Sequence, residues 1–316
     1  MAWILGIDEA GYGPNLGPFV MSAVACRVAD DTPPPDLWKT LQAAVRRGRV
    51  KKNDLRIHVD DSKVVYNAAK GLAGLERAAF SVFGLPAGTL HELTSRLCPD
   101  DREELAAEVW YRGGQALPGY AKMDDLQTRV PHFAASCEEA EVGDWVARSV
   151  VVCPRRFNRL VRNADSKGAV LAYAFIRLLM DMLPRTPEGM LSVHVDKQGG
   201  RNSYASQIQQ AVPGMVVVVE EGAERSAYRV VGADRTIELS FQPRADGEHF
   251  CVALASMVSK YLRELFMGEF NRFWQSHLPG LAPTAGYPAD APRYFAALGP
   301  VLERLEVAAD DVWRCR

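Results

Sequence analysis

The stretch GIDEAGYGPNLGP, residues 6–18, places two acids, Asp8 and Glu9, between a short apolar run and a segment rich in glycine and proline. The run before them, residues 3–7, is uninterrupted and β-prone, which is typical of a strand buried on both faces. A second apolar run, FVMSAVACRV at residues 19–28, follows, so we expect two neighbouring strands in a hairpin-like connection. Two adjacent carboxylates at the end of a buried strand therefore need an explanation.

The composition is ordinary for a globular chain of 316 residues, and the formal net charge is −2. This charge gives no global attraction for nucleic acid, so such binding would depend on the basic stretches RRGRVKK (46–52) and RRFNRLVR (155–162). The six cysteines include no C-x-x-C pair, which favours a reducing compartment and argues against a zinc site or a disulfide framework. The residues before Asp8 are too few for a signal-peptide core, and no apolar run approaches about 18 residues. We therefore expect a cytoplasmic protein without a membrane segment.

Strand and helix patterns alternate along the chain, which predicts an α/β fold with a mixed central sheet flanked by helices. One domain is expected over 1–316, interrupted by an insertion at about 84–144 and ending in a helical part at about 252–316. The run TIELSFQ alternates cleanly, as a half-buried antiparallel edge strand does. Further strands are expected at 145–154, 191–196 and 215–222, and helices at 68–83, near 100–112, at 163–183 and at 252–274.

Four acids stand at the ends of predicted elements. Asp8 and Glu9 end the first strand, Asp196 ends LSVHVD, and Asp246 precedes the long C-terminal helix. A single acid at a strand end is more often a cap or an ion-pair partner, but four such acids could converge at one edge of the sheet. Clustered carboxylates repel one another and stay ionised only if a cation offsets them. Oxygen ligands without histidine or thiolate favour Mg²⁺ or Mn²⁺, and the matching chemistry is two-metal phosphoryl transfer.

Several motifs resemble those of the ribonuclease HII family. GIDEAGYGPNLGPFVMSAV is similar to the family's opening, GIDEAGRGP followed by a GPxV strand. DDSK at 60–63 resembles the family's DSK element, and RADGEHFCVALASMVSKYLREL at 244–265 resembles an acid followed by a helix of the form AASxxAKxxRD. GYP at 286–288 matches a further motif. The motifs occur in family order from residue 4 to about residue 298, outside the insertion.

The resemblance implies a ribonuclease H-like fold and a metal-dependent endonuclease that cleaves RNA in RNA–DNA hybrids or at ribonucleotides embedded in duplex DNA. It implies that Asp8, Glu9, Asp196 and Asp246 are the catalytic residues and the ligands of Mg²⁺ or Mn²⁺, two ions in all. Ser62 and Lys63 would then lie against the nucleic-acid backbone. Gly11 and Gly13 would approach the ribose 2′-OH, which separates RNA from DNA, and Tyr287 would pack on the same sugar.

Tyr12 departs from the family, because an arginine stands there between the two glycines. The change removes a guanidinium suited to bidentate phosphate contact. Tyr12 could instead stack on a base or sugar, or simply cover the apolar underside of the loop. Two alternatives remain open on these residues: a structure-specific DNA nuclease on the same fold, and a non-catalytic nucleic-acid-binding protein.

Other residues have simpler interpretations. The triplet Asp165-Ser166-Lys167 repeats DSK but stands where a helix N-cap belongs, so capping is expected. His194, two residues before Asp196, is expected to be a strand histidine with a hydrogen-bond partner. Phe270, Phe273 and Trp274 occur at helical spacing and are expected in the core instead of forming a base-stacking surface.

Overall fold

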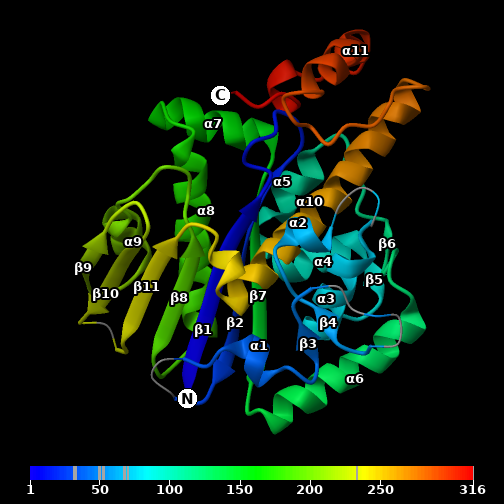
Figure 1. Ribbon diagram of the computed structural model, residues 1–316. Coiled ribbons are helices and arrows are strands. Elements are labelled where there is room, and N and C mark those ends of the chain that lie inside the picture. Colours follow the sequence, from blue (N-terminus) through cyan, green and yellow to red (C-terminus); the bar gives the residue numbers. More distant parts are fainter. Residues whose placement is uncertain are drawn as a thin grey trace.

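The computed structural model describes residues 1–30, 34–48, 51, 54–66, 69, 71–232 and 234–315. Its centre is a seven-stranded sheet of order β7-β2-β1-β8-β11-β10-β9 (Figure 1). The strands are β1 (Ala2–Ala10), β2 (Phe19–Val28), β7 (Gly143–Val152), β8 (Leu191–Asp196), β9 (Met215–Glu221), β10 (Ser226–Val231) and β11 (Ile237–Gln242). β1, β2 and β7 are antiparallel, whereas β8 runs parallel to both β1 and β11. The expected α/β class with a mixed central sheet is confirmed.

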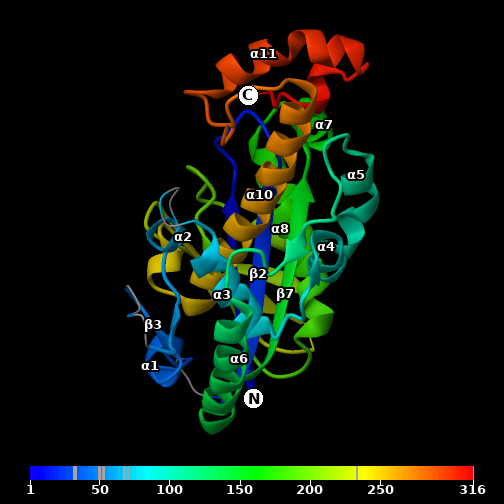
Figure 2. The same ribbon diagram turned by 90° about the vertical axis from the view of Figure 1, so that its right-hand side faces the viewer.

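Helices cover both faces of the sheet (Figures 1 and 2). One face carries α10 (Phe250–His277), α3 (Ala73–Phe83) and α6 (Met123–Glu139), and the other carries α7 (Pro154–Ala164), α8 (Gly168–Met182) and α9 (Ala205–Ala211). Successive side chains of β1 enter the two cores in turn: Ile4 packs with the α10 side, and Leu5 with the α8 side. The first strand reads as an uninterrupted apolar run because both of its faces are buried.

The remaining elements are short, apart from the C-terminal helix α11 (Ala291–Arg304), which continues the expected helical end of the chain. They are α1 (Leu37–Thr40), β3 (Val45–Arg46), β4 (Ile57–His58), α2 (Ser62–Val65), β5 (Gly88–Thr89), α4 (Leu90–Leu97), η1 (Pro99–Asp101), α5 (Arg102–Ala107), β6 (Ala116–Leu117), η2 (Leu183–Arg185), η3 (Ala245–Gly247) and η4 (Ala309–Asp311). No helix within the described ranges combines the length and the apolar character needed to span a membrane.

Two expectations about the last strands were wrong. β10 was not foreseen, although it pairs with both β9 and β11. Because β10 lies beside β11, the run TIELSFQ is an interior strand that is parallel to β8, not an antiparallel edge. Its alternating pattern arises because Glu238 is only half-buried, whereas its neighbours Ile237 and Leu239 are buried. A strand that is covered on both faces can also carry such a polar position.

The helix expected at 163–183 is α8, which begins later, at Gly168, and the first residues of the expected range end a separate helix, α7. α7 begins at Pro154, a residue suited to the first helical position, and α8 begins at Gly168. Between them Asp165 adopts the left-handed conformation, with φ of 46°, and ends α7. Asp165 is therefore not an N-cap, and the N-cap position of α8 is Lys167, which makes no capping hydrogen bond with its side chain. The helix expected near 100–112 is shorter and comprises only η1 and α5. The helix expected at 68–83 is α3, which begins at Ala73, while residue 68 lies outside the described residues.

The segment expected to be an insertion packs onto the core through two buried acids. Glu76 of α3 is fully buried and accepts hydrogen bonds from the backbone N–H groups of Gly119 (2.9 Å) and Tyr120 (2.6 Å) and from the Tyr261 hydroxyl (2.6 Å). Asp101 of η1 accepts a hydrogen bond from the Val151 N–H at 2.8 Å. These contacts hold residues from 84–144 against α10 and β7, and the single-domain organisation stays a prediction.

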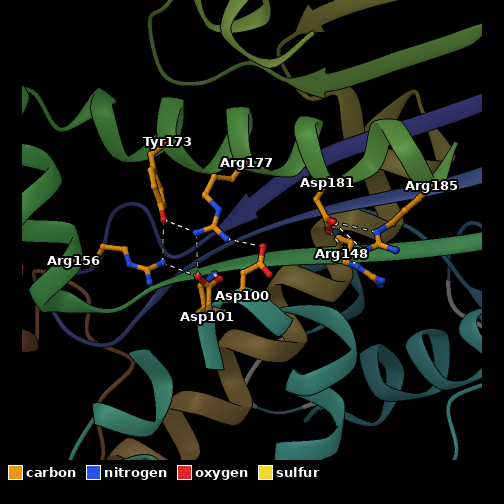
Figure 3. Close-up of polar contacts among 9 residues, drawn as sticks. Asp100, Asp101, Arg148, Arg156, Tyr173, Arg177, Asp181 and Arg185 are labelled. Atoms are coloured by element: carbon orange, nitrogen blue, oxygen red, sulfur yellow. Dashed lines mark hydrogen bonds and ion pairs between the residues drawn. The ribbon is translucent and has the colours of Figure 1, made fainter. Parts of the chain in front are cut away.

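Ion pairs extend the attachment at Asp101 along α8 (Figure 3). Arg156 of α7 donates to Asp101 at 2.6 Å, and Arg177 of α8 donates to Asp100 at 2.9 Å. The second cluster in Figure 3 joins Asp181 to Arg148 of β7 at 3.2 Å. The buried cluster at Asp101 and the second cluster at Asp181 fix α8 relative to the sheet.

Candidate active site at the ends of β1 and β8

The sheet brings Asp8 and Asp196 to one edge. β1 and β8 are parallel neighbours with Ile7 opposite Val195, so the next residue on each strand, Asp8 and Asp196, lies at the same side of the sheet. Asp246 follows in η3, just beyond β11, and the neighbouring Ala245 N–H donates to Asp196 Oδ1 at 2.8 Å. These contacts place acids from three separate parts of the chain at one end of the sheet.

Close packing of α10 on β1 fixes the acids further. A Cβ atom at Gly6 would lie 2.2 Å from the backbone of Cys251 and Val252, so only glycine allows the helix to approach the strand this closely. Ser259 on the same helix donates to the Asp8 carbonyl oxygen at 3.0 Å. α10 is thereby held against β1, with its start beside Gly6 and Ser259 beside Asp8.

The two acids of the opening motif are in an environment that disfavours their charged forms. Burial raises the pKa of Asp8 well above its usual range; the negative charges of Glu9 and Asp196 add to this rise, and a hydrogen bond from Ser256 opposes it. Burial, together with the charge of Asp196, raises the pKa of Glu9 to about 8, while Lys63 opposes the rise. The Glu9 N–H donates to Asp8 Oδ1 at 2.7 Å.

The other two acids belong to the same electrostatic group. The pKa of Asp196 is raised by burial and by the charge of Asp246, against the effect of Lys63. Burial and the charge of Asp61 raise the pKa of Asp246, again against Lys63. The structure therefore brings all four predicted acids together, with the exposed Lys63 as a cation that acts on three of them.

The four acids share the donor chemistry of a hard divalent cation, since each offers carboxylate oxygen. Across the described ranges, however, no three acidic, histidine or cysteine side chains converge closely enough to hold an ion. The arrangement is thus a set of mutually repelling carboxylates, not a closed coordination shell. Their role as metal ligands and catalytic residues stays a prediction.

Gly11 and Gly13, which are predicted to face the substrate, differ in their backbone conformation and in the space around them. Gly11 has φ of +86°, and a Cβ there would lie 2.4 Å from the Nε atom of the buried Arg263. Gly13 is exposed, and a Cβ there would meet nothing within 4 Å. The structure of the chain itself requires glycine at 11, whereas at 13 the open space leaves the backbone accessible to another molecule.

Tyr12 is half-buried between these glycines. Its ring packs edge-to-face on Phe19, with centroids 6.3 Å apart, and the Lys167 ammonium lies 4.7 Å from the ring centroid. Burial and the charge of Glu9 raise the pKa of its hydroxyl, while Arg201 opposes the rise. Tyr12 thus covers part of the apolar underside of the loop and also reaches the charged groups of the site.

The predicted backbone contacts at DSK are split between two environments. Ser62 is buried, and its hydroxyl is hydrogen-bonded to the Ser256 hydroxyl at 3.0 Å, which joins α2 to α10. Lys63 is exposed, and its N–H donates to the N-cap Asp61 at 2.8 Å. Lys63 can contact a ligand, whereas Ser62 supports the packing beneath it.

The GYP segment joins the loop between β1 and β2. The Gly286 carbonyl accepts hydrogen bonds from the N–H groups of Asn15 (2.7 Å) and Leu16 (3.3 Å), and the ring of Tyr287 is 46% exposed. The guanidinium of Arg263 lies 5.6 Å from the centroid of that ring. Tyr287 is therefore fixed at the surface, close to the loop that carries Gly11 and Gly13.

The C-terminal residues secure the same loop. The Arg314 N–H donates to the Asn15 carbonyl at 2.9 Å, and the side chain of Arg314 donates to the Pro14 carbonyl. Arg314 is almost fully buried, and burial lowers the pKa of its guanidinium to about 9. Figure 1 shows the C-terminal end beside the β1–β2 connection.

Most of the predicted basic stretches are engaged within the protein. Residues 155–162 lie in α7, where Arg155 pairs with Asp311, Arg156 with Asp101 and Arg162 with Asp310. In the stretch 46–52, Arg47 lies 3.7 Å from the Trp38 ring centroid and donates to the Gly247 carbonyl, while residues 49, 50 and 52 lie outside the described residues.

The simpler interpretations of other residues hold where they concern the core. His194 has a hydrogen-bond partner, since its Nδ1 atom is 2.8 Å from the Ser240 hydroxyl, and it stacks on His249 at 3.8 Å. Burial lowers the pKa of His194 to about 3. Phe270 and Trp274 are fully buried and therefore not available as a stacking surface for a nucleic-acid base, whereas Phe273 is half-buried.

Sequence reasoning missed Lys167 and Arg201 as neighbours of the site. Lys167 was assigned to a cap because of its helix-start pattern, and Arg201 gave no signal in the sequence. The repeated DSK triplet was the only available hint.

Comparisons with known proteins give likenesses in structure only. No protein-family model matches the chain, and no curated protein matches it by sequence. A similar solved structure is RNase HII from Archaeoglobus fulgidus in complex with PCNA, at 16% identity and a TM-score of 0.41, covering 99% of this chain and 94% of that one. Another is ribonuclease H2 from Pyrococcus horikoshii OT3, at 15% identity and a TM-score of 0.44, covering 98% and 92%. A third is Bst-RNase HIII in complex with Mn²⁺, at 14% identity and a TM-score of 0.41, covering 99% and 66%.

All three are named as ribonucleases H.

Proposed function

We propose that this chain is a metal-dependent endonuclease, similar to ribonuclease HII, that hydrolyses RNA in RNA–DNA hybrids or at ribonucleotides embedded in duplex DNA. The observation that carries the proposal is the meeting of Asp8, Glu9, Asp196 and Asp246 from β1, β8 and η3, with the pKa of each raised by burial and, for the first three, by another of these acids. Buried carboxylates that repel one another cost stability unless a cation offsets them. A cytoplasmic location belongs to the same proposal.

Mg²⁺ or Mn²⁺, in two sites, would be held by these four carboxylates and would supply activation of water and stabilisation of the leaving oxygen. The chain's own residues prepare that binding. Ser256 and the backbone N–H of Glu9 hydrogen-bond to Asp8 and favour its ionised form, while the Ala245 N–H does the same for Asp196. Lys63 reduces the repulsion among the other carboxylates without closing the site.

Recognition of ribose is proposed at the surface between the β1–β2 loop and GYP. Gly13 leaves an accessible backbone there, and Tyr287 presents an exposed ring fixed by Gly286 and Arg263. A 2′-OH can both donate and accept hydrogen bonds, so an accessible backbone amide or carbonyl can distinguish RNA from DNA. The apolar face of a sugar can pack on the aromatic ring.

The test uses three labelled duplexes: an RNA–DNA hybrid, a DNA duplex with one embedded ribonucleotide, and plain DNA. Each is incubated with the full chain and Mg²⁺ or Mn²⁺. We expect cleavage of the first two and none in the presence of a chelator. Asp8→Asn should abolish cleavage with an unchanged circular dichroism spectrum, while Asp30→Asn, an exposed acid beyond the far end of β2, should cleave like the wild type.

The alternative results of this test would indicate different functions. Cleavage of plain or branched DNA with no preference for ribose would point to a structure-specific DNA nuclease. Tight binding of hybrid with no cleavage under either metal would point to a non-catalytic binding protein. Cleavage that survives in Asp8→Asn would contradict the role given to the carboxylates.

A further inference from the structure

Two cations from distant parts of the chain gather around Tyr12. The Lys167 ammonium lies 4.7 Å from the centroid of the Tyr12 ring and 5.9 Å from that of Phe157. Arg201 acts electrostatically on the Tyr12 hydroxyl. A Cβ atom at Gly168, the first residue of α8, would lie 3.3 Å from Arg201 Nη2 and 3.5 Å from Ser166 Oγ. A lysine, an arginine and a hydroxyl thus meet beside Tyr12 at the start of α8.

The position of Arg201 is fixed by the residues after it. The Tyr204 hydroxyl donates to the Arg201 carbonyl at 3.0 Å and accepts a hydrogen bond from the Gln198 N–H at 3.1 Å. Tyr204 is fully buried and stacks on Phe241 with ring centroids 3.7 Å apart. The segment that carries Arg201 is therefore built onto the core.

This cluster adjoins the carboxylates on the side away from Lys63. Tyr12 is influenced by the charge of Glu9, and Tyr204 by those of Glu9 and Asp196. Lys63 belongs to α2, which packs with α10, whereas Lys167 and Arg201 lie at α8, on the opposite face of the sheet (Figure 1). A strand of nucleic acid that crosses this edge of the sheet would pass from one basic side chain to the other over the four acids.

We propose that Lys167 and Arg201, with the Ser166 hydroxyl, form a subsite for a backbone phosphate of the substrate strand. The inference rests on the proposed function and specifies how the chain holds its nucleic acid. Lysine and arginine are the usual partners of phosphate, and the start of the 15-residue helix α8 adds partial positive charge. Cation–π contact with Tyr12 holds the ammonium above the loop. Lys167, at the start of α8, therefore supplies a positive charge beside position 12, where tyrosine replaces the arginine of the ribonuclease HII motif.

The test compares binding of a labelled RNA–DNA hybrid by the full chain at several salt concentrations, with a chelator present to prevent cleavage. The variants are Lys167→Gln, Arg201→Gln and the charge-preserving Lys167→Arg. Arg185→Gln is the matched control, because it removes the same charge just beyond the other end of α8, about 25 Å away along the helix. Melting curves establish that each variant is folded.

We expect Lys167→Gln and Arg201→Gln each to weaken binding about tenfold and to reduce the slope of log K against log [salt] by about 0.9, since one phosphate contact is lost. Lys167→Arg and Arg185→Gln should retain the wild-type slope. Wild-type slopes and affinities in both neutral variants would overturn the subsite, and so would an equal loss in Arg185→Gln.

The results separate the subsite from the nuclease activity. If the wild type cleaves hybrid with Mg²⁺ or Mn²⁺ but the neutral variants bind as it does, the subsite is wrong and the proposed function stands. If the salt slopes change as expected but no metal supports cleavage, the subsite stands and the nuclease activity is wrong. If the wild type binds no nucleic acid, both are wrong.

Discussion

Replacing Glu9 by glutamine is expected to stabilise the metal-free protein, because folding must either protonate Glu9 or bring its charge close to other carboxylates. The pKa of Glu9 is raised from 4.5 to about 8. At about 1.4 kcal/mol per pH unit, this difference in pKa lowers the free energy of unfolding by at most about 5 kcal/mol above pH 8 and by at most about 3 kcal/mol at pH 7. Solvent screening of this half-buried side chain reduces the expected gain at pH 7 to about 2 kcal/mol.

The dependence on pH has a definite sign. Below about pH 4.5 Glu9 is protonated in both the folded and the unfolded chain, so its full contribution to stability is present. As the pH rises from 4.5 to about 8, the unfolded chain releases this proton first, and the contribution is lost. Glutamine does not titrate, so the advantage of Glu9→Gln should be small at pH 5, grow through pH 7 and level off above pH 8.

Urea unfolding with a chelator, at pH 5, 6, 7 and 8, measures this difference. Glu303→Gln, which changes an exposed acid on α11, is the matched control and should show no such trend. Saturating Mg²⁺ should remove the advantage, because the cation then offsets the charge that glutamine lacks. An advantage that is absent at pH 8, or that is the same at every pH, would refute the reasoning.

Three further expectations follow from the same structure. Mg²⁺ or Mn²⁺ at about 100 times its Kd should stabilise the wild type by about 2.7 kcal/mol and leave Asp8→Asn/Asp196→Asn unchanged; an equal rise in melting temperature in both would mean that the cation binds elsewhere. Gly11→Ala should cost about 1–3 kcal/mol in urea unfolding, because φ is +86° and the new Cβ would overlap a buried arginine, whereas Gly13→Ala should cost little; equal costs would contradict the assignment. Glu76→Gln should lower the free energy of unfolding by about 2–3 kcal/mol, because the buried Glu76 carboxylate accepts several hydrogen bonds. An unchanged free energy of unfolding would show that the segment after β5 does not depend on Glu76.

The convergence of Asp8 and Asp196 could be predicted because it follows from strand order alone. Each acid ends a run of buried strand residues, and parallel neighbours end at the same edge of a sheet. Asp246 could be included because it precedes the long helix, although its final position depends on the turn of η3 after β11. The apolar pattern of β1 and β2 likewise predicted their pairing.

The proximity of the two cations to Tyr12 could not be predicted, because it depends on the tertiary structure. Lys167 and Arg201 are separated by α8 and β8, and only the packing of Tyr204 on Phe241 brings the second to the first. The helix α7 was hidden for a local reason: its arginines dominate the sequence, and its apolar face is narrow. Glycine patterns were ambiguous as well, since contact with Arg263 already requires glycine at position 11.

The hydrogen bonds from Arg314 to Pro14 and Asn15 have a consequence for biosynthesis. The loop after β1 leaves the ribosome about 300 residues before the arginine that secures it. The acids on β1 can be in place once β8 has paired, but the loop beside them must wait until residue 314 has been made. A nascent chain or a fusion that displaces residue 314 would therefore carry assembled carboxylates next to an unsecured loop.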